Sequence, residues 1–512
     1  MLILYKDLEA DLEKLFYRLI YDKRLKRSIT ILEMVYKAKY IVSIKTLEEF
    51  LSISRKTVFT TLDFAKTLLP PHLTIIVNDE GVMLQNESNQ SIESAIMDIA
   101  KQTLSYQIIE HAFFNLDLNI HDLAEKLYVS ESTLRVRIKH MNKMLSEFGC
   151  KLSYYDVTMI GEEANIRYFY YAYFAEFQEL YVHVCEDMLQ YCDDIYNNLK
   201  KMIAVYDYKS LNYSYQQVTR WLLITKERMD LEKYIKLDES FLERMRTRTS
   251  YNFFKKVYVE ELSHYLSNPN IPEDEIVWAY VMTFNTVIYT RNDGERILFQ
   301  DEEDNKPIMQ KIEMVLFRAL ETSINRKRLK KEDIDDFLEV HMAYLLNLSL
   351  LTEISSIFQW GSPAVLGAVR PMIQDLYQMW FDILSDLHEE ELFKISNLYC
   401  ISLQLAMISS QFYNNNKSKA EKVLYSFEGE SGLAVYLQSL AKRMLPLGVE
   451  AEFIYNVPIT SEKIESINPD VLVHNYELVE NIEGIKTFRM SQIPQIQEWN
   501  CLKELVIDLD YI

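Results

Sequence analysis

Residues 120–138 read IHDLAEKLYVSESTLRVRI, and the interpretation of the whole chain starts from this stretch. The spacing is typical of a helix-turn-helix, in which a short helix is followed by a turn and a second, longer helix. Ala124 is small where the second helix must approach closely, and Ser130 is the expected N-cap of that helix. The apolar positions that would pack the two helices together are Leu123, Leu127, Val129, Leu134 and Ile138.

The second helix of this motif is expected to direct its polar side chains outward. Hydroxyl, guanidinium, ammonium and imidazole donors suit phosphates and base edges when such a helix lies in the major groove of duplex DNA. The alternative is a generic helical hairpin, which shows similar apolar spacing. The candidate DNA-binding residues in this unit are Ser130, Ser132, Thr133, Arg135, Arg137, Lys139 and His140.

An earlier stretch, residues 47–62 (LEEFLSISRKTVFTTL), repeats the pattern when Ser54 is aligned with Ser130. Its apolar positions superpose, but its chemistry differs. Phe59, Thr61 and Asp63 stand where the second copy has Arg135, Arg137 and Lys139, and the cations at the start of its second helix are Arg55 and Lys56. We therefore expect the second unit to dominate DNA affinity, while Arg55 and Lys56 either add phosphate contacts or belong to a structural unit.

Each helical pattern is followed by a candidate β-hairpin. The helices and the hairpin together predict a winged helix. The runs 74–77 and 82–84 flank a turn that ends in Gly81, and the runs 151–154 and 157–160 precede Gly161. Upstream, residues 5–27 are predicted to form one helix that ends in a basic cluster.

The rest of the chain divides into a long helical part and a short mixed part. Residues 162–415 show almost continuous helical periodicity. Beyond them, strand patterns at 422–427, 449–455 and 469–473 alternate with helical ones such as 431–445, which predicts a small α/β domain with a parallel sheet. The expected fold class is therefore mainly α and multidomain.

The charge distribution agrees with two different roles for the two parts. The net charge of the 512 residues is −21, yet residues 1–160 hold 20 Lys and Arg against 21 Asp and Glu, so the excess lies almost wholly in residues 161–512. Because DNA repels an acidic surface, any contact with it is expected from the N-terminal part. The aromatic run at 168–177 could suggest a platform for single strands, but its acidic surroundings favour core packing.

Composition also limits location and chemistry. We find no run of about 18 apolar residues, no signal-peptide pattern at the start, and five scattered cysteines without a Cys-x-x-Cys pair. These observations predict a cytoplasmic protein without a membrane segment, metal site or cofactor.

Taken together, the two helix-turn-helix units, the helical middle and the α/β end resemble the Mga/AtxA class of virulence regulators of low-GC Gram-positive bacteria. The most recognisable stretches are Leu123–Met141, Arg220–Ile224 and Val340–Leu346. The resemblance implies a global or virulence-gene activator that binds duplex DNA as a homodimer or larger assembly, with phosphotransferase-system proteins as possible partners.

The resemblance also implies a domain order. The helical middle would hold two helical-bundle phosphotransferase-regulation domains, and the α/β end would resemble enzyme IIB and support self-association. The implied domains are 1–88 (N-terminal helix and first winged helix-turn-helix), 89–163 (second winged helix-turn-helix), 164–290 and 291–412 (regulatory domains), and 418–512 (enzyme IIB-like).

Such regulatory domains are controlled by histidine phosphorylation, so the replaced acceptors matter. Trp221 and Met282 stand where the first domain would carry its histidines. In the second domain His341 and His388 are candidate phosphorylation sites, although we favour the interpretation that His341 is a helical histidine satisfied by a carbonyl or carboxylate. His183 and His264 have no matching segment.

The enzyme IIB-like end also lacks the phosphoryl acceptor that the resemblance implies. Phe427, followed by Glu428, occupies the position of the phosphorylated cysteine, and Phe cannot accept a phosphoryl group. We therefore expect no enzymatic activity. The alternatives to a transcription regulator are a phosphotransferase-linked phosphoryl carrier and a helical scaffold that binds protein.

Overall fold

The structure is a computed structural model of the whole chain. It describes residues 14–38, 41–87, 92–114, 119–177, 190–198, 214–262, 270–289, 306–361, 365, 369–387, 392–413, 420–428, 431–445, 449–457, 459–478, 482, 484–491, 494 and 496–507. Contacts divide the chain into two compact units, a larger one of Met1–Thr322 with Asp335–Ser410 and a smaller one of Ser323–Ile334 with Gln411–Ile512. This division is coarser than the five predicted domains, whose boundaries stay predictions.

The first winged helix shows how local sequence sets the element ends. Its elements are α2 (Leu15–Leu19), α3 (Lys23–Lys37), α4 (Ile44–Leu51), α5 (Arg55–Leu68), β1 (Leu73–Val77) and β2 (Val82–Asn86). The prediction of one helix over 5–27 is wrong, as far as residues from 14 onward are described. The Asp22 side chain accepts from the N–H groups of Arg24 and Leu25, so it caps a new helix, and the basic cluster begins α3 instead of ending a helix.

The hairpin of this unit is confirmed, with strands slightly longer than predicted. β1 and β2 pair antiparallel from Leu73 opposite Asn86 to Val77 opposite Val82. Val42 adds a bridge to Val82, and Gly81 has φ +149° with its backbone so close that a Cβ would lie 2.3 Å from the Val42 carbonyl oxygen. This position therefore requires glycine.

The second winged helix repeats the architecture in a shorter form. Its elements are α6 (Ile92–Lys101), α7 (Leu104–Phe114), α8 (Ile120–Lys126), α9 (Glu131–Leu145), the 3-10 helix η1 (Ser146–Phe148), β3 (Cys150–Leu152) and β4 (Met159–Gly161). The antiparallel pairing of β3 with β4 confirms the second hairpin, although both strands are shorter than predicted and lie farther from the turn.

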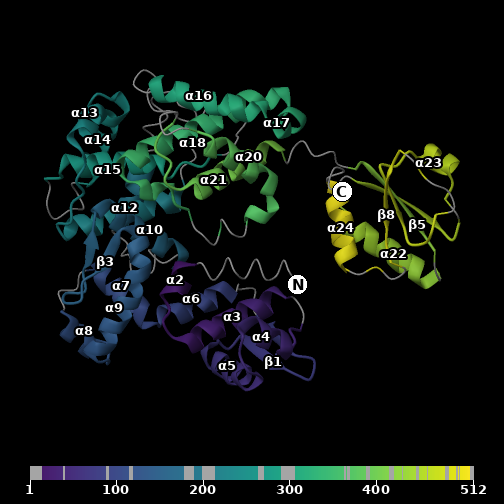
Figure 1. Cartoon of the computed structure of the whole chain (residues 1–512), viewed down its shortest axis with the longest axis horizontal. Helices are drawn as coiled ribbons and strands as arrows, with labels where there is room; N and C mark the ends of the chain where they lie inside the picture. The colour runs from purple at the N-terminus through teal and green to yellow at the C-terminus, as the bar shows by residue number, and fades with distance from the viewer. Residues whose placement is uncertain are drawn as a thin grey trace. The chain divides into compact units, whose positions relative to one another are not determined.

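The helical part follows directly. Its helices are α10 (Glu163–Phe177), α12 (Tyr215–Asp230), α13 (Glu239–Arg246), α14 (Thr249–Leu262), α15 (Glu273–Phe284), α16 (Lys306–Glu321), α17 (Ser323–Arg328), α18 (Ile334–Ile354), α20 (Gln374–Ser385) and α21 (Leu398–Tyr413), with 3-10 helices η2 (Lys331–Asp333), η3 (Ser356–Gln359) and η4 (Arg370–Met372) (Figure 1). The aromatic residues of α10 form core, since Phe169 and Tyr170 are fully buried. No helix among the described residues is long and apolar enough to cross a membrane.

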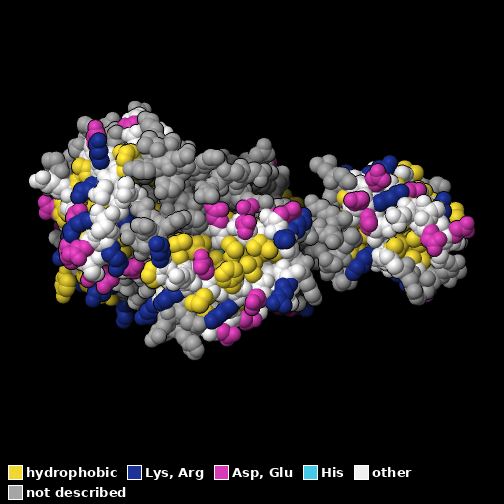
Figure 2. All heavy atoms as spheres, turned by 90° about the horizontal axis from the view of Figure 1, so that it is seen from above, with side chains coloured by type: hydrophobic (Ala, Val, Ile, Leu, Met, Phe, Trp, Pro, Cys, Tyr) yellow, Lys and Arg dark blue, Asp and Glu magenta, His cyan; other side chains and the backbone are white. Residues whose placement is uncertain are grey.

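The outer face of α16 carries hydrophobic side chains. Met314 and Phe317 are 51% and 56% exposed. Figure 2 shows hydrophobic side chains gathered on this face among scattered cations and carboxylates.

The C-terminal α/β part matches its sequence pattern closely. Its elements are β5 (Lys422–Phe427), α22 (Ser431–Met444), β6 (Glu450–Tyr455), α23 (Ser461–Ile467), β7 (Val471–His474), β8 (Lys486–Arg489) and α24 (Ile496–Ile507). The sheet has the order β6-β5-β7-β8 with every pair parallel. The structure thus confirms a mainly α, multidomain chain with a small parallel sheet near its end.

Candidate nucleic-acid interface

The second helix-turn-helix is defined by side-chain caps at both of its helices. Asn119 accepts from the N–H groups of His121 and Asp122 at the start of α8. Ser130 accepts from Thr133 N at 3.1 Å at the start of α9, and its hydroxyl also lies 2.9 Å from the Thr133 hydroxyl. Ser130 therefore caps α9 and satisfies an otherwise unpaired N–H group of its first turn, while the Thr133 hydroxyl is engaged with Ser130.

The six residues expected on one outer face of α9 are divided by the structure. Ser132 and Lys139 are exposed, as predicted, and they lie on the side opposite the buried Leu134 and Ile138. Arg135 is half-buried beside the wing, the loop between β3 and β4. Its guanidinium donates to the Tyr154 carbonyl at 3.1 Å and lies 3.6 Å from Glu131.

Arg137 and His140 do not lie on this face, which corrects their predicted placement. The Arg137 guanidinium carbon lies 3.9 Å from the centre of the Tyr21 ring, a cation–π contact with the segment between α2 and α3. The His140 ring packs edge-on against the same tyrosine at 5.3 Å. Partial burial lowers the pKa of His140, and the nearby Lys26 lowers it further. Their role in DNA binding stays a prediction.

One exposed residue at the centre of α9 was missed. Val136 is 50% exposed and stands between Ser132 and Lys139 on the outer face, which continues to the exposed Lys143. The spacing of four, three and four residues is the helical repeat, so the sequence contained the signal for this stripe. Tyr128, at the turn before α9, is 96% exposed with φ +54°, a backbone region rarely adopted by residues other than glycine.

The first unit has the same caps but a different outer face. Ser54 accepts from Thr57 N at 3.3 Å. Arg55 and Lys56 are exposed at the start of α5, as predicted, and the Arg55 guanidinium carbon lies 5.9 Å from the centre of the Phe59 ring. Thr61, the counterpart of Arg137, is buried. The flank that carries Arg137 in the second unit therefore packs inward in both copies.

His341 is enclosed within α18 and its neighbours. One ring nitrogen lies 2.7 Å from the Phe337 carbonyl oxygen and the other 2.8 Å from the Ser409 hydroxyl. The ring stacks on Trp380 at 5.3 Å, and complete burial lowers its pKa to about 4. These contacts fit the interpretation of a structural histidine. His388, like His183 and His264, lies outside the described residues.

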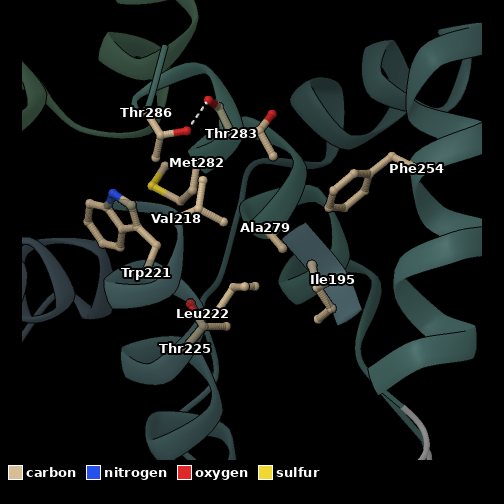
Figure 3. A pocket seen from close by; sticks show the side chains of 10 residues that line it. All are labelled: Ile195, Val218, Trp221, Leu222, Thr225, Phe254, Ala279, Met282, Thr283 and Thr286. Atoms are coloured by element: carbon tan, nitrogen blue, oxygen red, sulfur yellow. Dashed lines mark hydrogen bonds between the residues drawn. The ribbon is translucent and has the colours of Figure 1, made fainter. Parts of the chain in front are cut away.

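The two positions of the replaced acceptors meet at one pocket. Trp221 of α12 and Met282 of α15 both line this pocket, which is small and partly open to solvent. Figure 3 shows Met282 beside the indole of Trp221, with Thr283 and Thr286 close by. The Trp221 ring stacks on Tyr171 at 4.3 Å. A bulky indole therefore fills the place where a phosphorylatable imidazole was expected.

Buried charges join α10, the first helix of the helical part, to α12 and α15. Arg167 of α10 donates to Glu275 of α15 through two nitrogens, at 2.7 and 2.8 Å. Glu163, four residues earlier, accepts from Arg167 at 3.0 Å and from Arg228 of α12 at 2.8 Å. Burial alone would lower the pKa of Arg167, but the carboxylates of Glu275 and Glu163 raise it above its usual value. We call these four residues the buried charge cluster.

In the C-terminal part, Phe427 is the last residue of β5 and is 1% exposed. Its ring packs beside Tyr425 in the core of the sheet. Glu428 follows it and donates its N–H to the side chain of Asn475. The position expected for a phosphorylated cysteine is therefore part of the core.

Comparison with known proteins shows what the second winged helix resembles. A family model described as the Mga helix-turn-helix domain matches residues 88–174. The chain is 24% identical over 297 residues to the capsule synthesis positive regulator AcpA of Bacillus anthracis, which covers 53% of this chain and 61% of the relative. It is 26% identical to AcpB of the same organism over 150 residues, or 29% of this chain and 31% of AcpB.

A further relative is the anthrax toxin expression trans-acting positive regulator of Bacillus anthracis, at 23% identity over 41% of this chain and 43% of the relative. The matches thus span less than two thirds of each relative. The fold and the matched domain define the class, a protein with a helix-turn-helix domain of the kind found in transcription regulators. Within that class the chain is similar to regulators of the Mga/AtxA type. The assignment of its helical and C-terminal parts to phosphotransferase-type domains stays a prediction.

Proposed function

We propose that this chain binds duplex DNA and activates transcription, and that α9 of the second winged helix makes the principal contact. The observation that carries the proposal is the exposed stripe Ser132, Val136, Lys139 and Lys143 on a helix whose opposite face is buried. A helix with this arrangement fits the major groove, where its cations meet phosphates and its centre meets base edges. The names of the relatives, positive regulators of capsule synthesis and toxin expression, support activation.

The test is binding to random-sequence duplex DNA across a salt series, with Lys139→Glu/Lys143→Glu as the variant. Both lysines are exposed, so the exchange leaves the core intact, whereas a change at Arg137 would also disrupt its packing on Tyr21. Each lost phosphate contact is expected to lower the slope of log affinity against log salt by about 0.9. We expect the variant to bind much more weakly and with a shallower slope.

The matched control is Lys463→Glu/Lys503→Glu, which reverses two exposed cations on α23 and α24 of the C-terminal part. It should bind like the unaltered chain. An equal loss of DNA affinity in both variants would show that binding depends on the net charge of the chain and not on α9. A folded chain that binds no duplex at low salt would refute the proposal and favour a scaffold that binds protein.

We also propose self-association through the C-terminal part, as the resemblance implies. Val435 and Tyr436 on α22 are 67% and 59% exposed, an apolar surface suited to a second copy. Sedimentation velocity of Val435→Lys/Tyr436→Lys should show a smaller species than the unaltered chain. If Met314→Lys/Phe317→Lys has this effect instead, the self-association surface lies on α16.

Finally, we propose that the chain has no enzymatic activity and is not a phosphoryl carrier. Trp221, Met282 and Phe427 occupy the expected acceptor positions, and both ring nitrogens of the buried His341 have partners. Intact-mass analysis after incubation with the general phosphotransferase proteins and phosphoenolpyruvate should show no added phosphoryl group. A phosphohistidine at His341 or His388 would overturn this proposal and make phosphotransferase proteins direct partners.

A further inference from the structure

We propose that Val136 reads the methyl group of thymine in an A·T pair, while Arg135 is a positioning residue that holds the wing and does not read guanine. This inference rests on the proposed binding of α9 in the major groove. It assigns a base preference to the centre of that helix and a contact role to Tyr155 of the wing.

The chemistry of Val136 restricts what it can recognise. The side chain is 50% exposed, and its neighbours on the stripe are a hydroxyl and two ammonium groups. A valine has no donor or acceptor, so it cannot pair with the polar edges of guanine, cytosine or adenine. The thymine C5-methyl is the apolar group that the major groove presents to such a side chain.

Arg135 adjoins the exposed stripe and carries the group that usually forms a two-bond contact with guanine, but its guanidinium is already engaged. One terminal nitrogen donates to the Tyr154 carbonyl at 3.1 Å, and the other lies 3.6 Å from Glu131. The guanidinium carbon is also 5.7 Å from the centre of the Tyr155 ring. Turning it toward a base would forfeit these contacts.

The wing is fixed to both helices of the motif. The Tyr155 carbonyl accepts from Ile120 N, at the start of α8, at 2.7 Å, and the Tyr154 carbonyl accepts from Arg135 of α9. The Tyr155 N–H donates to the Ser153 hydroxyl at 3.2 Å. With its backbone held in this way, the Tyr155 ring remains 76% exposed.

A large aromatic side chain on a fixed backbone loses little conformational entropy when it binds. The phenol offers a hydroxyl to a phosphate and a ring face to a sugar. We therefore assign Tyr155 to the sugar-phosphate backbone beside the groove that α9 occupies, with Arg135 holding it there.

The experiment begins with selection of binding sites from a randomised duplex library by the full-length chain. In the selected duplexes, thymine is then replaced by deoxyuracil, which removes the methyl group and keeps the pairing. Because one buried CH₂-sized group contributes about 0.8 kcal/mol, we expect roughly a 4-fold loss of affinity at the position that faces Val136.

Val136→Ala should bind the thymine and deoxyuracil duplexes equally well. The control Val457→Ala, at an exposed valine after β6, should retain the full difference. If the unaltered chain binds the selected duplexes but no thymine-to-deoxyuracil exchange weakens binding, the reading by Val136 is refuted while the proposed function stands. If no duplex is enriched or bound, the proposed function itself fails.

The role of Arg135 is separated by a second selection. Arg135→Ala should enrich the same sequences as the unaltered chain, with uniformly lower affinity. In the double variant with Tyr155→Ala, the two losses of DNA affinity should not add. Loss of a guanine preference in Arg135→Ala would overturn its assignment as a positioning residue.

Discussion

The buried charge cluster should respond sharply to the loss of one charge. Arg167 and Glu275 are both fully buried, and Glu163 and Arg228 are 12% and 4% exposed, so the four charges balance away from water. Glu275→Gln removes one of them and leaves an uncompensated cation. Breaking a buried pair in this way costs about 3–5 kcal/mol. The substituted amide could still accept from Ile235 N, which lies 2.6 Å from the Glu275 carboxylate, so the loss would report the charge itself.

The double variant Arg167→Met/Glu275→Gln restores neutrality. Its loss of stability should be smaller than the summed losses of the two single variants by about 2 kcal/mol or more, because both charges of the pair are removed together. A remaining cost is expected, since Arg167 also donates to the Lys233 carbonyl at 2.9 Å and that acceptor would lose its donor.

The assay is hydrogen exchange of α10 and α15 under native conditions at increasing urea, which gives the free energy of opening for this region even if the whole chain does not unfold in one step. The matched control is Glu273→Gln, also on α15, whose partners Arg246 and Lys255 are about 40% exposed; it should cost at most about 1 kcal/mol. Equal losses in Glu273→Gln and Glu275→Gln, or strictly additive single losses, would refute the reasoning.

Three further results are expected. Burial lowers the pKa of His341 from 6.5 to about 4, so in this pH range the folded chain keeps the ring neutral while the unfolded chain takes up a proton. The free energy of unfolding should therefore fall by about 3 kcal/mol between pH 6.5 and 4. In urea unfolding at several pH values, His341→Gln should lack this contribution, and an unchanged pH profile in the variant would contradict the prediction. Gly81→Ala should destabilise the first winged helix by about 2 kcal/mol or more, because a Cβ there meets the Val42 carbonyl; an unaltered melting curve in calorimetry would exclude that clash. Ser130→Ala should cost about 1 kcal/mol through loss of the cap on Thr133 N, measured as faster hydrogen exchange of the α9 amides, and the same protection in both chains would contradict it.

Patterns that depend on near neighbours in the chain were predicted well. The strand β5 was predicted with its observed bounds, 422–427, because a short, mostly apolar run with β-branched and aromatic residues favours a buried strand of a parallel sheet. The helix-turn-helix at 120–138 was likewise found from apolar spacing. The boundary at Asp22 was missed although its N-cap signal was present, because the apolar periodicity runs through it.

Contacts between residues far apart in the chain could not be predicted from the sequence. The helical repeat locates Arg137 on α9, but only the fold shows that Tyr21, 116 positions earlier, covers its flank. Arg167 and Glu275 are 108 residues apart, and no local sequence pattern predicted that either side chain would be buried. Each depends on how whole elements pack, which local propensity does not determine.

The chain passes from β4 to α10 through a single residue, since β4 ends at Gly161 and α10 begins at Glu163. A helix of this length, about 22 Å at 1.5 Å per residue, behaves as a lever whose short end is the wing hairpin. Tilting it by about 10° about that end would move the far end by roughly 4 Å. Conversely, a displacement of that size at the far end of α10 reaches the wing as a small rotation, because a single residue, Glu162, separates α10 from β4.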